Sequence, residues 1–305
     1  MLAPFLLMKL ERISGCKVNL LLNILGKRAD GFHELETLMH PVPVHDRITL
    51  ETIPGGVELT CSDPTLPVDS TNLVCRAADE FLTVTDIKSG VRLHLDKQIP
   101  LAAGLGGGSG DAATTLLGLN DLFDCPLDRS GLHRLAAKLG SDVPFFLQAK
   151  PAMATGRGEI VEAMEWFPAL RGVWILVIHP GFGIPTAWAY RSLSRFPAAL
   201  NGPPGRAARL IRQLQTADLA AVGRDLYNSL ESPALEKFPI LRLYQDFLRA
   251  EGAVATLMSG SGSSTFALAN SEAEVQGLRE KFLHRFGPRA WTAAVALPAG
   301  TLAQA

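Results

Sequence analysis

Apolar and polar positions alternate with period two at several places in the N-terminal half, and this alternation predicts strands. The predicted strands cover residues 46–51, 57–60 and 91–95. A longer apolar run begins at Lys17, turns at residues 28–31 and resumes with Phe32 and His33. Polar side chains therefore flank a turn and a buried strand close to the start of the chain.

Apolar residues at helical spacing predict helices between these strands. The first helix covers residues 73–81, and the polar residues 70–72 before it can cap its N-terminus. A second helix is predicted at residues 128–139, and the segment 142–148 is typical of a short helix with proline in its first turn. Residues 153–160 indicate a bent strand or a hairpin.

The pattern changes in the C-terminal half. A continuous apolar run at residues 172–178 is typical of a buried strand, and we interpret it as the first strand of a second domain. The further elements predicted are helices at 207–214, 217–226 and 238–250, strands at 254–258 and 265–269, a helix at 272–286 and a strand at 290–296.

One glycine-rich loop stands out between a predicted strand and a predicted helix. Five glycines occupy seven positions at residues 104–110, directly before an Ala/Thr/Leu run. Glycine has no Cβ, so a ligand can approach its amides closely, and a helix N-terminus offers unpaired N–H groups to an anion. A flexible linker is the alternative, but the flanking strand and helix favour a site for nucleotide phosphates.

The glycine loop differs from two common nucleotide-binding motifs. No Gly-Lys-Ser/Thr ends it, as a Walker A motif requires, and Ser109 stands where a GxGxxG motif has its third glycine. Neither HRD nor DFG, the signatures of protein kinases, occurs in the chain.

Composition limits the classes of protein that fit. The chain has 305 residues, which favours two domains, and its formal net charge of -1 argues against nucleic acid as the main partner. The four cysteines form no CxxC pair, so we expect reduced thiols in a cytoplasmic protein. We find no signal peptide and no apolar run long enough to span a membrane.

Several motifs together resemble one family of small-molecule kinases. The segment GLGGGSGDAA, four residues after Pro100, is similar to the phosphate-binding motif of the GHMP kinases, which include galactokinase, homoserine kinase and mevalonate kinase. The segments KVNLLLNILGKRADGFHELETL, GSDVPFF, GRGE, HPGFGIPT and SGSGSS narrow the resemblance to the branch that acts on a cytidine diphosphate-linked alcohol. The resemblance covers most of the chain.

The resemblance implies a two-domain α+β fold and a specific reaction. The N-terminal domain, residues 1–160, would bind ATP and be similar to the second domain of ribosomal protein S5. The C-terminal domain, residues 161–305, would be ferredoxin-like and contribute to the substrate cleft. ATP, with Mg²⁺, would phosphorylate the 2-hydroxyl of 4-diphosphocytidyl-2-C-methyl-D-erythritol in the non-mevalonate route to isoprenoids. The metal ligands are not identified by the motifs.

The resemblance also assigns the catalytic pair. Asp142 would accept the proton of the substrate hydroxyl or orient that hydroxyl, and Lys17 beside it would stabilise the developing alkoxide. By itself the sequence around Asp142 favours another role, because an aspartate before a short helix commonly caps it. For Lys17 the alternative is a structural lysine on the surface.

The remaining site residues divide between the two substrates. Asn72 and Lys97 would approach adenine and ribose, although Asn72 also makes a good helix cap. The ATP phosphates would lie against Pro100, Gly104, Leu105, Gly106, Gly107, Gly108, Ser109 and Gly110. The cytidine-linked substrate would contact Asn19, Phe32, His33, Thr186 and Tyr190, with His33 reading the cytosine edge between aromatic rings.

Three residues depart from the family pattern. Gly110 stands where a second serine is common, which leaves the Mg²⁺ ligands open, Phe32 stands where tyrosine is frequent, and Cys16 replaces a small alanine.

Other functions remain open at this point. A GHMP kinase for homoserine or a mevalonate derivative is the nearest alternative, and a nucleotide-binding homologue without catalysis is another. A nucleic-acid module is a third, against which the near-neutral charge argues. We expect a small-molecule partner, no nucleic acid, no membrane, and a monomer or weak homodimer.

Overall fold

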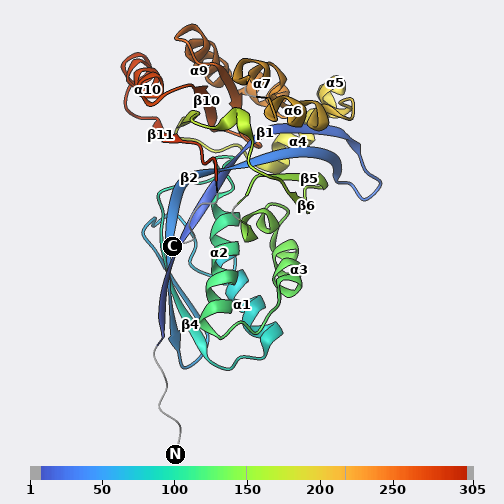
Figure 1. Cartoon of the computed structure of the whole chain (residues 1–305). Helices are drawn as coiled ribbons and strands as arrows, with labels where there is room; N and C mark the ends of the chain where they lie inside the picture. Colours follow the sequence, from blue (N-terminus) through green and yellow to red (C-terminus); the bar gives the residue numbers. More distant parts are fainter. Residues whose placement is uncertain (1–7, 149, 217, 301–305) are drawn as a thin grey trace, which may run out of the picture.

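Two long antiparallel strands, β1 (Lys9–Lys27) and β2 (His33–Ile53), run through the whole molecule. The structure is a computed structural model that describes residues 8–148, 150–216 and 218–300. In Figure 1 the β1–β2 pair rises from the N-terminal end, bends, and passes beneath the helices of the C-terminal half. The two sheets of the molecule are built on this pair and beside it.

The larger sheet has the strand order β3-β4-β2-β1-β8, and the β5–β6 hairpin branches from β2. Its other strands are β3 (Val57–Cys61), β4 (Gly90–Asp96), β5 (Ala152–Gly156), β6 (Ile160–Ala163) and β8 (Tyr227–Asn228). The helices of the N-terminal half are α1 (Leu73–Thr85), α2 (Gly107–Leu122), α3 (Arg129–Leu139) and the 3-10 helix η1 (Val143–Leu147). Apolar side chains of α1, α2 and α3 form one buried cluster with β2 and β4.

The smaller sheet has the order β11-β7-β10-β9, with every neighbouring pair antiparallel. Its strands are β7 (Trp174–His179), β9 (Ala255–Met258), β10 (Thr265–Ala269) and β11 (Trp291–Ala296). Helices connect β7 to β9 and β10 to β11, and a hairpin connects β9 to β10, which is the ferredoxin-like order. The fold expected from the family resemblance is therefore confirmed.

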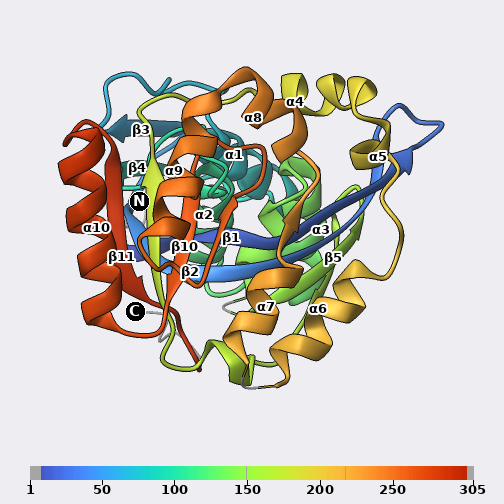
Figure 2. The same cartoon turned by 90° about the horizontal axis from the view of Figure 1, so that it is seen from above.

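Helices cover the smaller sheet and the upper part of β1 and β2. The helices α9 (Pro239–Ala250) and α10 (Glu272–Phe286) lie together over the smaller sheet, as Figure 2 shows from above. The further helices are η2 (Pro168–Leu170), α4 (Thr186–Ser192), η3 (Leu193–Arg195), α5 (Pro197–Leu200), α6 (Arg206–Leu214), α7 (Leu219–Asp225) and α8 (Glu231–Lys237). One hydrophobic cluster joins β1 to the smaller sheet, with Val18, Leu20 and Phe266 among its members.

Most predicted elements are present, and the differences have local reasons. The predicted strand at 46–51 is the end of β2, which extends without a break from His33. Residues 35–42 of β2 are buried without alternation, so period two could not reveal that part. The short elements α4, α5, α8 and β8 were not predicted, and residue 217 of the predicted helix 217–226 lies outside the described residues.

Two further expectations concern the chain as a whole. Within the described residues, no helix combines the length and the apolar character that a membrane crossing requires. The domain division between residues 160 and 161 stays a prediction, and the larger sheet takes β8 from beyond it.

Candidate active site

A single large cleft of about 1400 Å³ collects nearly all of the predicted site residues. It is lined by β1 and β2, by the glycine-rich loop, by the start of α4, and by the 259–264 loop. The predicted residues that line it are Lys17, Asn19, Phe32, His33, Asn72, Lys97, Pro100, Gly104, Leu105, Gly106, Gly107, Gly108, Ser109, Asp142, Thr186 and Tyr190. Gly110 is buried beneath this surface and does not line the cleft.

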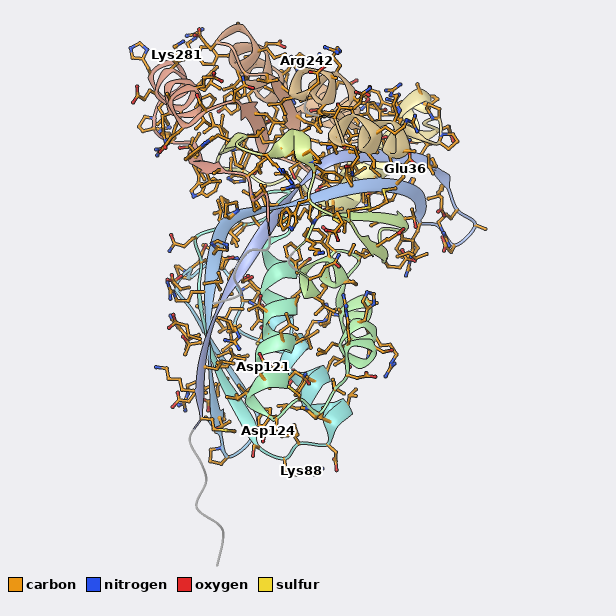
Figure 3. The ribbon with its side chains drawn as sticks, viewed as in Figure 1. Glu36, Lys88, Asp121, Asp124, Arg242 and Lys281 are labelled. Carbon is orange, nitrogen blue, oxygen red and sulfur yellow. The ribbon has the colours of Figure 1, made fainter. Side chains whose placement is uncertain are left out.

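The glycine-rich loop ends in a helix N-terminus that opens toward the cleft. Gly104 and Gly106 have φ of 75° and 73°, a left-handed conformation that glycine adopts without strain. Gly106 is the N-cap of α2, and no side chain caps the helix. The first amides of α2 therefore lack intrahelical partners. Figure 3 labels Asp121 at the other end of α2, so the helix dipole presents its positive end to the cleft.

A second loop supports the glycine-rich loop from the C-terminal half. A Cβ on Gly104 would lie 2.1 Å from the carbonyl oxygen of Ser259, so the two backbones touch. The Ser259 hydroxyl donates to Gly104 O at 2.9 Å, and Ser264 N donates to Ala103 O at 3.0 Å. The segment SGSGSS contributed to the family resemblance, but its contact with residues 103–104 is a tertiary feature.

Lys17 and Asp142 meet at the base of this loop. Lys17 Nζ lies 3.4 Å from Asp142 Oδ2, and the lysine side chain is 4% exposed whereas the aspartate is 40% exposed. Asp142 occupies the N-cap position of η1, yet its side chain accepts no capping hydrogen bond. Capping therefore does not explain this aspartate, and the surface position considered for Lys17 is wrong. The half-exposed carboxylate faces the cleft with an ammonium beside it.

Asn19 lies two residues after Lys17 on the same face of β1. Its amide oxygen accepts from Lys17 Nζ at 2.6 Å, and its amide nitrogen donates to Thr37 Oγ1 at 2.8 Å. The side chain thus holds the ammonium, a role that sequence reasoning did not assign. Contact of Asn19 with the substrate stays a prediction.

An aromatic pair, His33 and Tyr190, lines the same cleft. The His33 and Tyr190 rings are 5.1 Å apart between centroids and tilted by 40°. Burial, with a smaller contribution from Lys27, lowers the pKa of His33, which favours the neutral imidazole. Burial, and then the charge of Asp142, raises the pKa of Tyr190, so its phenol keeps the proton. A neutral ring that can both donate and accept suits a planar polar base.

Phe32 and Thr186 are two further side chains that line the cleft. Phe32 is 53% exposed, and the guanidinium of Arg157 lies 4.7 Å from the centre of its ring. Arg157 belongs to the segment GRGE, and its position over Phe32 was not predicted from the sequence. Thr186, at the start of α4, shares a hydrogen bond of 3.0 Å with Ser261.

The two residues expected near adenine and ribose are held by the protein itself. Asn72 caps α1 by accepting from Val74 N at 2.9 Å, and it donates to Pro67 O at 2.8 Å. The capping role considered for Asn72 is therefore confirmed. Its approach to a nucleotide stays a prediction.

Lys97 is buried between two carboxylates that sequence reasoning missed. Its Nζ lies 2.8 Å from Asp111 Oδ2 and also contacts Asp46 Oδ2. Burial by itself would lower the pKa of Lys97, but Asp111 and Asp46 outweigh it and raise that pKa. Burial raises the pKa of Asp111 to about 7. The local signal was present only for Asp111, which directly follows the last glycine of the loop.

Comparisons with known proteins agree with this geometry. Family profiles described as GHMP kinases N terminal domain and GHMP kinases C terminal match residues 72–150 and 210–289. A 4-diphosphocytidyl-2-C-methyl-D-erythritol kinase of Syntrophotalea carbinolica is 38% identical over 280 residues, covering 92% of this chain and 96% of that protein. One of the same description from Synechococcus sp. (strain JA-3-3Ab) is 38% identical, covering 90% of this chain and 89% of that protein.

Solved structures give a similar result. A crystal structure of 4-(cytidine 5'-diphospho)-2C-methyl-D-erythritol kinase has a TM-score of 0.77 and 36% identity, covering 94% of this chain and 99% of that one. A homoserine kinase from Cytophaga hutchinsonii has a TM-score of 0.74 over 95% of both chains, but at 20% identity it shows a shared fold alone.

Proposed function

Because the chain belongs to the GHMP kinases and, among them, to the family of 4-diphosphocytidyl-2-C-methyl-D-erythritol kinases, we propose that it phosphorylates that compound. ATP is the co-substrate of the family, and its γ-phosphoryl group passes to the 2-hydroxyl of the erythritol. The products are ADP and the 2-phosphate. The reaction is a step of the non-mevalonate route to isoprenoid precursors.

The observation that carries the proposal is the Lys17–Asp142 pair beside the open end of α2. Phosphoryl transfer depends on alignment and charge stabilisation more than on covalent chemistry. The amides of residues 107–109 bind the phosphates, and Asp142 orients the acceptor hydroxyl and takes its proton. Lys17, 3.4 Å from that carboxylate, stabilises the alkoxide as it forms.

The aromatic pair of His33 and Tyr190 supports a cytidine-linked acceptor. His33 and Tyr190 offer a polar ring and a buried aromatic face within 5.1 Å of each other. The exposed ring of Phe32 adds a stacking surface, and the absence of a tyrosine hydroxyl there leaves stacking intact. Thr186 and Asn19 line the same cleft and would contact this acceptor.

The residues present are compatible with Mg²⁺. Within the described ranges, no group of three or more His, Cys, Asp or Glu side chains could hold a metal by itself. Mg²⁺ needs few protein ligands, because phosphate oxygens and water supply most of its octahedron. Ser109, which lines the cleft at the start of α2, is the residue that would hold it. When bound, the ion neutralises charge on the transferring phosphates.

Localisation and assembly belong to the same proposal. The four cysteines are free thiols, which fits a reducing compartment such as the cytoplasm. We propose a monomer or weak homodimer with no nucleic-acid partner. Sedimentation with and without RNA tests both statements.

Turnover with different acceptors tests the proposed reaction. We expect ATP-dependent ADP release with 4-diphosphocytidyl-2-C-methyl-D-erythritol and little with homoserine or mevalonate. Asp142→Asn should retain nucleotide binding while kcat falls about 10²–10⁴-fold, since general-base contributions have that size. Asp128→Asn is the matched control, because Asp128 caps α3 and asparagine caps equally well.

Three outcomes would contradict the proposal. No ADP release with the cytidyl compound, but release with homoserine or mevalonate, would assign the chain to another GHMP activity. Full activity of Asp142→Asn would remove Asp142 from the mechanism. Binding of ATP without turnover of any acceptor would favour a non-catalytic homologue.

A further inference from the structure

The strand segment that carries Lys17 and Asn19 lies between two irregularities of β1. The register with β2 shifts between Gly15 and Cys16, and again between Asn19 and Leu21. Lys17 and Asn19 are two residues apart, so their side chains point to one face of the sheet. Bulges change the direction of side chains and are common beside active sites. The side chains of this short segment therefore have a direction that is set independently of the rest of β1.

The Lys17 ammonium has one near and two more distant oxygen neighbours among the described residues. Asn19 Oδ1 lies at 2.6 Å, whereas Gly104 O and Asp142 Oδ2 both lie at 3.4 Å. Only the first distance is that of a strong hydrogen bond. The position of the ammonium between the glycine-rich loop and Asp142 thus depends mainly on the amide oxygen of Asn19.

The orientation of the Asn19 amide is in turn fixed by Thr37. Asn19 Nδ2 donates to Thr37 Oγ1 at 2.8 Å, and Thr37 Oγ1 donates to Leu21 O at 2.6 Å. A hydroxyl has one hydrogen, and here it is committed to Leu21 O, so toward Asn19 the oxygen can only accept. Rotating the amide by half a turn would place its NH₂ group against the ammonium and its oxygen against lone pairs of Thr37.

We propose that Thr37 is a positioning residue for phosphoryl transfer, which acts by orienting the Asn19 amide that holds the Lys17 ammonium beside Asp142. Thr37 is 5% exposed and lies on β2, across the strand pair from Asn19. Its effect reaches the reaction through two hydrogen bonds. This inference rests on the proposed function of the cleft.

Two substitutions of Thr37 separate its hydroxyl from its shape. Thr37→Val keeps the branched shape but removes both hydrogen bonds, whereas Thr37→Ser keeps the hydroxyl. We expect Thr37→Val to lower kcat about tenfold or more with the KM for ATP within about twofold, because the loss concerns the transition state. Thr37→Ser should restore kcat to near the parent value.

Thr256→Val is the matched control. Thr256 is a buried strand threonine of the smaller sheet, and its hydroxyl has no hydrogen-bond partner within the described part of the chain. We expect this variant to have parental kcat and KM. Parental kcat in Thr37→Val would overturn the proposal, and so would equal losses in Thr37→Val and Thr37→Ser, which would indicate packing alone.

A measurement without turnover separates this proposal from the reaction itself. In protein labelled with ¹⁵N-asparagine, the Asn19 side-chain NH₂ signals are identified by their loss in Asn19→Asp. Thr37→Val should shift them and speed their exchange with water, whereas Thr37→Ser should not. If the parent protein fails to phosphorylate the cytidyl compound, the proposed function is wrong. If the Asn19 signals are unchanged in Thr37→Val, the positioning role of Thr37 is refuted, whatever the outcome of the activity assay.

Discussion

Replacing Gly110 by alanine would place a Cβ 2.4 Å from the carbonyl oxygen of Gly15 and 3.1 Å from Ser14 Oγ. Contact with a backbone oxygen at that distance cannot be relieved by rotating a side chain, so β1 or α2 must move. Gly15 immediately precedes Cys16 and Lys17, and the clash therefore disturbs the strand that carries the catalytic lysine. This close approach explains why glycine stands where the family pattern commonly has serine.

The expected magnitude combines two opposing effects. Forcing an extra methyl group into a packed interior costs about 1–3 kcal/mol, whereas replacing a helical glycine by alanine gains about 0.5–1 kcal/mol. The net loss in the free energy of unfolding is about 0–2.5 kcal/mol, and each kcal/mol lowers Tm by about 2–4 °C. Thermal unfolding followed by circular dichroism measures the change.

Gly277→Ala is the control for helix propensity. Gly277 lies within α10, and a Cβ there would meet no atom within 4 Å. We expect a small gain in Tm for Gly277→Ala and a loss for Gly110→Ala. A Gly110→Ala protein as stable as Gly277→Ala, with parental kcat, would refute the inferred clash.

Three further predictions concern charge and reactivity. Lys17→Met should lower kcat about 10²–10³-fold, because loss of one donor that stabilises the transition state has an effect of that size. Calorimetry should still detect binding of ADP to this variant. A variant that keeps a tenth of the parental kcat would contradict the prediction. Burial raises the pKa of Asp111 from 3.8 to about 7, so the folded protein keeps a proton that the unfolded chain releases, and Tm should fall as pH rises through that interval. Asp111→Asn should flatten this fall of Tm. An unchanged dependence of Tm on pH would exclude the effect. Burial also raises the pKa of Cys16 to about 12 and that of Cys75 to about 11. Iodoacetamide near pH 8 should therefore alkylate the exposed Cys125 first in the folded protein, which mass spectrometry of peptides measures. Equal labelling of Cys16 would contradict this prediction.

The sequence predicted elements best where their pattern was local and regular. The helix cap at Asn72 and the alternating strand β4 follow directly from neighbouring residues. The central part of β2 is buried on both faces, and such a strand has no alternation to detect. Short elements such as α4 and β8 are set by what they pack against rather than by their own periodicity.

The candidate site was predicted unevenly for a similar reason. The glycine-rich loop and the motifs around Lys17 and Asp142 carry short-range signals, so they could be assigned. Asp46 and Thr37 carry none, because an aspartate or a threonine within a strand is common, and their roles depend on partners far along the chain. Contact of Gly110 with the phosphates stays a prediction, and its close packing against Gly15 of β1 is a tertiary contact that the local sequence does not reveal.

The sequence by itself determined the kind of ligand, because glycine spacing before a helix is a local property that fixes where unpaired amides can face an anion. Only the tertiary structure decided how the reacting groups are held. The 3.4 Å approach of Lys17 to Asp142 brings together β1 and the start of η1, which lie far apart in the sequence. The orientation of Asn19 depends on a hydroxyl of the opposite strand. Contacts of that kind follow from strand register and bulges, which no local pattern of residues specifies.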